Sequence, residues 1–149
     1  MMKIKIKRID KSLPLPSFEK DAACFDLPCR ETVKIKPGEI ALVPVNCVMI
    51  IPKNSALMVF SRSSTPLRKG LILANSVGIV DPFYRGDNDE IVAQFLNITK
   101  KTVEVKKGEH LVQGMIVKRE EISWVEVNKM TGKGRGGYDK VLKRYNKKK

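Results

Sequence analysis

Residues 71–86 read LILANSVGIVDPFYRG, a stretch in which two short apolar runs flank a polar turn and lead into an Asp-Pro pair. The runs on either side of Asn75–Val77 are typical of β-strands, and the turn itself is typical of a β-hairpin tip. Two interpretations of the residues that follow remain open. They form either an Asp-Pro turn with a core aromatic, or a carboxylate (Asp81) and a stacking ring (Tyr84) beside a polar hairpin that could pair with the edge of a base.

Period-two alternation extends the strand pattern over most of the chain. Lys3–Lys7 and Thr32–Lys36 alternate polar and apolar residues, which predicts strands with one solvent-facing side. Ile40–Ile51 predicts a long, mostly apolar strand region. Further strands are predicted over residues 56–60, 71–74, 91–98, 102–105, 111–117 and 124–127. Because no segment carries a helical stripe of ten or more residues, the pattern favours an all-β barrel or sandwich.

Length and composition favour one domain followed by a basic arm. A chain of 149 residues is long enough to close a single core. From about Met130 the composition shifts to Gly, Lys and Arg, which is typical of a segment with low intrinsic order. We therefore predict a β-barrel domain over residues 1–129 and a flexible Gly/Lys/Arg-rich C-terminal arm over residues 130–149.

The net charge of +13 is unevenly placed, with a cluster of lysines in the last ten positions. Such a tail attracts polyanions. Nucleotides and nucleic acids both meet that description, so weak nucleic-acid contact through the tail is an expectation that the charge alone does not decide.

Other features exclude several classes of protein. Three cysteines without a C-x-x-C pair argue against a disulfide scaffold or a structural zinc site and predict buried free thiols. One histidine leaves little material for chemistry that needs a His base or several His ligands. The longest apolar stretch is too short to span a bilayer, and the N-terminus lacks the pattern of a signal peptide. A cytoplasmic or otherwise intracellular location is the expectation.

Five segments carry residues with chemistry of their own. ACFDL places the carboxylate of Asp26 in an apolar run, and SRSS sets Arg62 beside hydroxyls that could grip phosphate. NSVGIVDPFYRG is the third segment. GEHLVQGMI places the amide of Gln113 in an apolar strand, where it needs a partner. GKGRGGY combines glycines that allow close backbone approach with the ring of Tyr138. Taken singly, each segment also has an ordinary structural interpretation as a loop, a satisfied core amide or a basic tail.

Taken together and in this order, the five segments resemble the motifs of the trimeric dUTPase family over about residues 22–138. That resemblance implies a distorted, jelly-roll-like β-barrel that assembles as a homotrimer with active sites at subunit interfaces. It also implies hydrolysis of dUTP to dUMP and pyrophosphate with Mg²⁺. The metal would be carried largely by the triphosphate, since Mg²⁺ usually keeps several waters and binds substrate phosphates.

The resemblance also implies a role for each matching residue. Asp81 matches the base that deprotonates a water for attack on the α-phosphorus. Tyr84 matches the ring that packs under the deoxyribose and leaves no space for a ribose 2′-hydroxyl. Asn75 and the turn backbone, with Gly78, would read uracil, and Asp26 would act on the metal through water. The remaining residues implied to bind substrate are Arg62, Ser63, Ser64, Gln113, Lys133 and Tyr138.

The chain departs from the family pattern at three places. Asp87–Asp89 forms an apparent insertion after the third motif, and Gly114 suggests a β-bulge. In the fifth motif, Lys133 stands at an Arg position, Tyr138 stands at a Phe position, and Asp139–Leu142 replaces a Gly-Ser-Thr-Gly phosphate clamp. We expect weaker ordering of this arm on nucleotide.

Two alternative functions remain open. A dCTP deaminase would need a general acid/base Glu near the position of Gln94, and a glutamine cannot transfer that proton. A non-catalytic relative that senses dUTP or binds nucleic acid would fit the altered fifth motif and the basic tail. The presence of Asp81, Tyr84 and Arg62 together favours the hydrolase.

Overall fold

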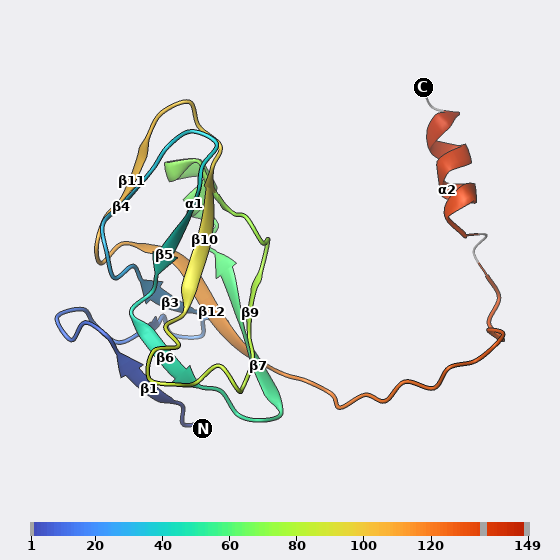
Figure 1. The fold of residues 1–149 in the computed structure, drawn as a ribbon, viewed down its shortest axis with the longest axis horizontal. Coiled ribbons are helices and arrows are strands. Elements are labelled where there is room, and N and C mark those ends of the chain that lie inside the picture. The colour runs from blue at the N-terminus through green and yellow to red at the C-terminus, as the bar shows by residue number, and fades with distance from the viewer. Residues whose placement is uncertain (1, 135–136, 148–149) are drawn as a thin grey trace.

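A computed structural model describes residues 2–134 and 137–147 and confirms an all-β core (Figure 1). Two helices accompany the strands: α1 (Ser64–Lys69) and α2 (Gly137–Asn146). The strands are β1 (Lys5–Arg8), β2 (Ser17–Phe18), β3 (Phe25–Pro28), β4 (Val33–Ile35), β5 (Ile40–Pro44), β6 (Cys47–Ile50), β7 (Ser55–Ser61), β8 (Leu71–Leu73), β9 (Gly78–Val80), β10 (Val92–Asn97), β11 (Val103–Val105) and β12 (His110–Lys118).

The strands pair antiparallel in sheets that wrap around one core (Figure 1). One sheet has the order β2-β3-β12-β7-β9, and a second has the order β5-β10-β8. β1 pairs with β6, and β11 pairs with β4. Inward side chains alternate with outward ones, so Leu57 and Val59 of β7 are buried and Phe95 of β10 is fully enclosed. This alternation explains why period-two patterning predicted most of the strands correctly.

The strand region predicted over residues 40–51 is formed but divided, because β5 ends at Pro44 and β6 begins at Cys47. Between them, Asn46 is buried and adopts a φ of 61°. Its side-chain Oδ1 accepts the N–H of Asp10 at 2.7 Å, and its Nδ2 donates to the Asp10 carbonyl at 2.9 Å. The break is therefore stabilised by a loop far away in the sequence, which local patterning does not contain.

The bulge expected at Gly114 is wrong. The register shift in β12 lies between His110 and Val112, while Gly114 pairs regularly with Phe25 and with Val59. The glycine is needed for space. A Cβ at position 114 would lie 2.7 Å from the Phe25 ring and 3.0 Å from Leu57 Cδ1.

The C-terminal part of the chain leaves the barrel after β12 (Figure 1). The strand predicted over residues 124–127 is not formed, and Trp124 is 90 % exposed. The pattern analysis did not anticipate α2, which lies well away from the barrel (Figure 1). The predicted domain boundary at residue 130 and the flexibility of the arm stay predictions. Within the described ranges, no helix is both long and apolar enough to cross a bilayer.

We expect Gly114→Ala to lower the free energy of unfolding by about 1–3 kcal/mol, because the added methyl group overpacks the Phe25 ring. Urea unfolding of the purified protein measures the loss. Gly132→Ala is the matched control, since a Cβ there meets nothing within 4 Å. Equal stability of the two variants would show that the Phe25 ring does not pack against Gly114 as described.

Candidate active site

The polar turn between β8 and β9 is present, but it does not close a hairpin. β8 pairs with β10, whereas β9 pairs with β7 in the other sheet. The turn is held by the Val77 N–H, which donates to the Asn75 carbonyl at 2.7 Å, and by the Ala74 N–H, which donates to the Gln94 carbonyl at 2.8 Å. The segment therefore bridges the two sheets and leaves Asn75 exposed at the opening between them.

A cavity of about 320 Å³ opens beside this turn, and we name it the Asp81 pocket. It brings together four of the residues implied by the family resemblance, namely Asn75, Gly78, Asp81 and Tyr84. Phe83, which is 78 % exposed, also lines the pocket. No feature of the sequence pattern marked it as a site residue. The other lining residues are Val59, Leu73, Ile79, Val80, Ile91, Val92, Ala93 and Gln94.

Asp81 and Tyr84 are held close to each other by a tight turn. The Tyr84 N–H donates to the Asp81 carbonyl at 3.1 Å, which closes the turn around Pro82 and Phe83. The Tyr84 hydroxyl donates to the Glu90 carbonyl at 3.0 Å. Both side chains are exposed at the pocket rather than packed in the core, so the interpretation of Tyr84 as a core aromatic is wrong.

A second cavity of about 180 Å³, which we name the Arg62 pocket, contains five more of the residues that the family resemblance implies. Asp26, Arg62, Ser63, Ser64 and Gln113 all line it. It also contains Ser17, Glu19, Ala22 and Cys24, which the sequence analysis did not assign to the site.

Arg62 has a defined orientation in its pocket. Its Nε lies 3.1 Å from Asp26 Oδ1, and its Nη1 donates to the His110 carbonyl at 3.3 Å. The Gln113 amide donates to the Ser61 carbonyl at 3.3 Å. A guanidinium beside two serine hydroxyls is a site for an anion, because the guanidinium supplies charge and the hydroxyls supply further donors.

The two pockets lie on opposite faces of the β3-β12-β7 sheet. Asp26, Gln113 and Phe60 occupy one cross-strand row. Since successive side chains in a strand point to opposite faces, Val59 of the Asp81 pocket points to the face opposite to that row. Among the described residues, no side chain lines both pockets. The two pockets are therefore separate within one chain.

Lys133 and Tyr138 of the fifth motif line neither pocket of the same chain. Lys133 and Tyr138 are exposed, Tyr138 at 73 %, and the arm that carries them extends away from the barrel (Figure 1). Arg135 lies outside the described residues. The binding roles of Lys133 and Tyr138 stay predictions.

A metal held entirely by protein groups does not fit the described parts of the chain. In residues 2–134 and 137–147, no three His, Cys, Asp or Glu side chains are grouped to hold an ion. Asp26 does fit a water-mediated role, since only its Oδ1 is paired with Arg62 and the side chain is 22 % exposed. A Mg²⁺ ion that arrives on substrate phosphates needs no more than this from the protein.

The chain is similar in sequence to known proteins of one family. A family model described as dUTPase matches residues 10–140. A deoxyuridine 5′-triphosphate nucleotidohydrolase of Lactococcus lactis is 36 % identical over 116 residues, which cover 76 % of this chain and 77 % of that protein. An enzyme of the same name from Helicobacter pylori is 32 % identical over 140 residues, covering 92 % and 94 % of the two chains.

Solved structures give the same result for the fold. The crystal structure of a dUTPase from Streptococcus mutans superposes with a TM-score of 0.73 at 35 % identity and covers 80 % of this chain and 98 % of that chain. A dUTPase from phage phi11 of Staphylococcus aureus, whose structure is described as visualising a species-specific insert, has a TM-score of 0.78 at 18 % identity. It covers 87 % and 99 % of the two chains and supports the fold alone.

Cys24 should react much faster with a thiol reagent than Cys29 and Cys47, because only the thiolate reacts. Burial raises the pKa of Cys29 and of Cys47 to about 12, so both stay protonated at neutral pH. Cys24 is partly exposed in the Arg62 pocket. We expect one fast-reacting thiol at pH 8 in a spectrophotometric disulfide-exchange assay. Cys24→Ser should remove this fast phase and Cys29→Ser should retain it; a fast phase from more than one thiol would contradict the described burial.

Proposed function

The chain belongs to the dUTPase family, and on that premise we propose how it hydrolyses dUTP to dUMP and pyrophosphate. The observation that carries the proposal is the Asp81 pocket, where an exposed polar turn, a carboxylate and an aromatic ring surround one cavity. In this proposal Asn75 and the turn backbone near Gly78 bind the uracil edge. A Cβ at Gly78 would lie 3.2 Å from Val59 Cβ, so the glycine keeps the turn close to β7.

Asp81 acts on the water that attacks the substrate. Its carboxylate accepts a proton from that water while the oxygen bonds to the α-phosphorus, and the bond to the bridging oxygen of pyrophosphate breaks. Tyr84 packs under the deoxyribose and excludes a 2′-hydroxyl. A deaminase would instead need a proton carrier on β10, where Gln94 lines the pocket and has no titratable proton.

The Arg62 pocket binds the triphosphate. Arg62, Ser63 and Ser64 donate hydrogen bonds to phosphate oxygens, and the Gln113 amide lies on the same side. Asp26 orients the guanidinium of Arg62 through the 3.1 Å ion pair and can hold a water of the incoming Mg²⁺. When bound, Mg²⁺ would stabilise charge on the departing pyrophosphate. Preorganised donors of this kind usually supply a large share of transition-state stabilisation.

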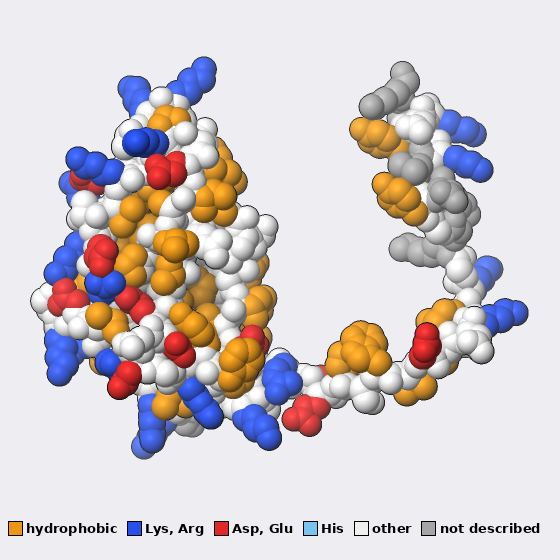
Figure 2. All heavy atoms as spheres, viewed as in Figure 1, with side chains coloured by type: hydrophobic (Ala, Val, Ile, Leu, Met, Phe, Trp, Pro, Cys, Tyr) orange, Lys and Arg blue, Asp and Glu red, His pale blue; other side chains and the backbone are white. Residues whose placement is uncertain are grey.

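We propose that the enzyme is a homotrimer in which each active site combines the Asp81 pocket of one chain with the Arg62 pocket of another. The separation of the two pockets supports this arrangement, since they share no lining residue in the described part of one chain. Two exposed apolar surfaces also support it. One is the outward face of β5 and β10, with Ile40, Leu42 and Val92 (Figure 2), and the other is the arm around Trp124. Lys133 and Tyr138 would reach a site on another chain. Weak nucleic-acid contact through the basic tail stays a prediction.

The substrate assignment is tested by pyrophosphate and ammonia release from dUTP, dCTP, dTTP and UTP, with and without Mg²⁺. We expect pyrophosphate from dUTP in the presence of Mg²⁺, much less from the other nucleotides, and no ammonia from dCTP. Ammonia release from dCTP would assign the chain to deamination, and nucleotide binding without turnover of any of them would assign it to a non-catalytic role.

The role of Asp81 is tested by Asp81→Asn. We expect kcat for dUTP to fall by about 10²–10⁴-fold, because the amide cannot accept the proton of the attacking water. Binding of dUTP, measured calorimetrically, should change little because the side chain keeps its size. Asp89→Asn is the matched control, because Asp89 is a carboxylate in the same loop and accepts the Gly86 N–H. Unchanged kcat in Asp81→Asn would remove this residue from the mechanism.

A further inference from the structure

The ring of Tyr84 is fixed by a contact at its far end. Its hydroxyl donates to the backbone carbonyl of Glu90 at 3.0 Å. Tyr84 is 39 % exposed and lines the Asp81 pocket, so packing against neighbouring residues restrains only part of its ring. The position of the Glu90 backbone therefore sets how far the ring can tilt into or out of the pocket.

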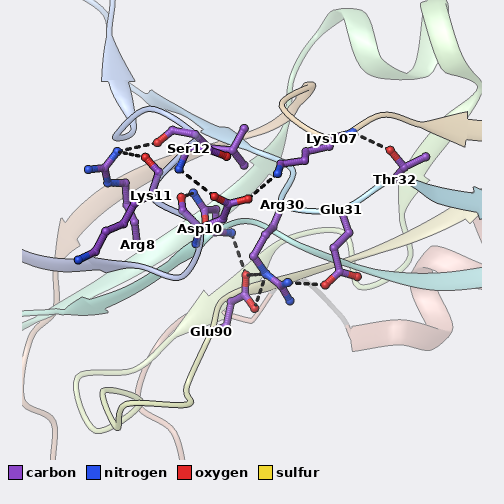
Figure 3. Close-up of polar contacts among 11 residues, drawn as sticks. Arg8, Asp10, Lys11, Ser12, Arg30, Glu31, Thr32, Glu90 and Lys107 are labelled. Carbon is purple, nitrogen blue, oxygen red and sulfur yellow. Dashed lines mark hydrogen bonds and ion pairs between the residues drawn. The ribbon is translucent and has the colours of Figure 1, made fainter.

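Glu90 is in turn fixed by two other segments of the barrel (Figure 3). Arg30 Nε donates to both carboxylate oxygens, at 2.8 Å and 3.0 Å. The Asn46 N–H donates to the same carboxylate at 3.0 Å. The Glu90 side chain is 14 % exposed and that of Arg30 is 25 % exposed, so the pair is shielded from much of the solvent screening that weakens surface ion pairs.

The groups that hold Glu90 are themselves anchored. The Arg30 N–H donates to the Pro44 carbonyl at 2.8 Å, which fixes the base of that side chain. Asn46 is buried, and both the oxygen and the nitrogen of its side-chain amide bond to the Asp10 backbone. Asp10 also pairs with Lys107 at 2.5 Å (Figure 3). The peptide group of the Glu90 carbonyl is also held directly, since the Ile91 N–H donates to the Cys47 carbonyl at 2.9 Å. Together with the contacts of the Glu90 carboxylate, this ties the position of the carbonyl to the barrel and not to its own loop.

Residues 87–89, the apparent insertion, lie directly before Glu90. Hydrogen bonds between Gly86 and Asp89 close this segment into a turn. The Asp89 carboxylate accepts the Gly86 N–H at 2.7 Å, and the Asp89 N–H donates to the Gly86 carbonyl at 3.0 Å. Lys7 of β1 donates to the Asp87 carbonyl at 2.9 Å. The loop therefore returns to a fixed point at Glu90.

We infer that Arg30 and Glu90 are positioning residues for sugar recognition, which hold the Tyr84 ring where it discriminates deoxyribose from ribose. This inference rests on the proposed function, in which the Tyr84 ring lies under the sugar. A ring that can tilt away makes room for the 2′-hydroxyl, so loss of the clamp admits the ribonucleotide. Neither residue touches the substrate, and both act through the Tyr84 hydroxyl.

The test compares the ratio of kcat/KM for dUTP to kcat/KM for UTP among variants of the full-length enzyme. We expect Tyr84→Phe to reduce this ratio about fivefold, because it removes a single hydrogen bond of about 1 kcal/mol that restrains the ring. Arg30→Met should reduce the ratio by a smaller factor, because the hydrogen bond remains and only its acceptor is held less firmly. Arg30→Lys should restore part of the ratio, since an ammonium can still pair with Glu90. Glu104→Gln is the matched control, because its ion pair with Lys34, at 4.0 Å, lies on the exposed surface of β4 and β11 and should leave the ratio unchanged.

A double-mutant cycle separates positioning from general destabilisation. If Arg30 acts through Tyr84, the double variant Arg30→Met/Tyr84→Phe loses no more selectivity than the stronger single variant. Loss of folded protein lowers both substrates equally and leaves the ratio unmoved, and thermal unfolding confirms that all variants are compared in the folded state. Wild-type selectivity in Arg30→Met and Tyr84→Phe would overturn the inference while leaving dUTP hydrolysis intact. A wild-type enzyme that does not hydrolyse dUTP would overturn the proposed function itself.

Discussion

Side-chain alternation along β12 is the constraint on which the rest of the structure depends. β12 lies between β3 and β7, and its residues Val112, Gln113 and Gly114 pair with both strands, so two registers place them at once. Val112 and Gly114 face the core, and Gln113 between them must face outward, beside Asp26. The missing side chain of Gly114 lets the Phe25 ring close against the sheet. A shift of one residue would exchange the two faces and remove both the core and the anion pocket.

In the proposed trimer, the same alternation gives each chain two half-sites, the Asp81 pocket and the Arg62 pocket, on opposite faces of one sheet. The sheet that positions Arg62, Asp26 and Gln113 on its outer side also separates them from Asp81 and Tyr84. Each half-site is ordered within the protomer: Arg62 by its ion pair with Asp26, and Tyr84 by its contact with Glu90. Assembly would then have to join two preorganised halves rather than order either of them, which keeps the entropic cost of building the complete site low.

The sequence predicted those parts of the molecule that local pattern determines. Period-two alternation located most strands, and the resemblance of ordered motifs identified Asn75, Asp81 and Tyr84, which share a pocket. The errors arose where distant residues decide the local structure. The break at Asn46 depends on hydrogen bonds with Asp10. The two strands beside Asn75 pair with strands of two different sheets and not with each other. The contact between Arg30 and Glu90 joins residues 60 positions apart and has no local signal. The segment around Trp124 has a strand pattern but no strand partner among the described residues.

The central claim, that one active site draws on two chains, is tested most directly by mixing two inactive variants. Asp81→Asn disables one half-site and Arg62→Ala disables the other. Unfolding an equal mixture of the two and refolding it together would produce mixed trimers, in which about a quarter of the sites combine an intact Asp81 from one chain with an intact Arg62 from another. The account predicts that pyrophosphate release from dUTP recovers to about that fraction of wild type, while each variant refolded alone stays inactive. No recovery in the mixed trimers would contradict it, because both halves would then have to come from the same chain.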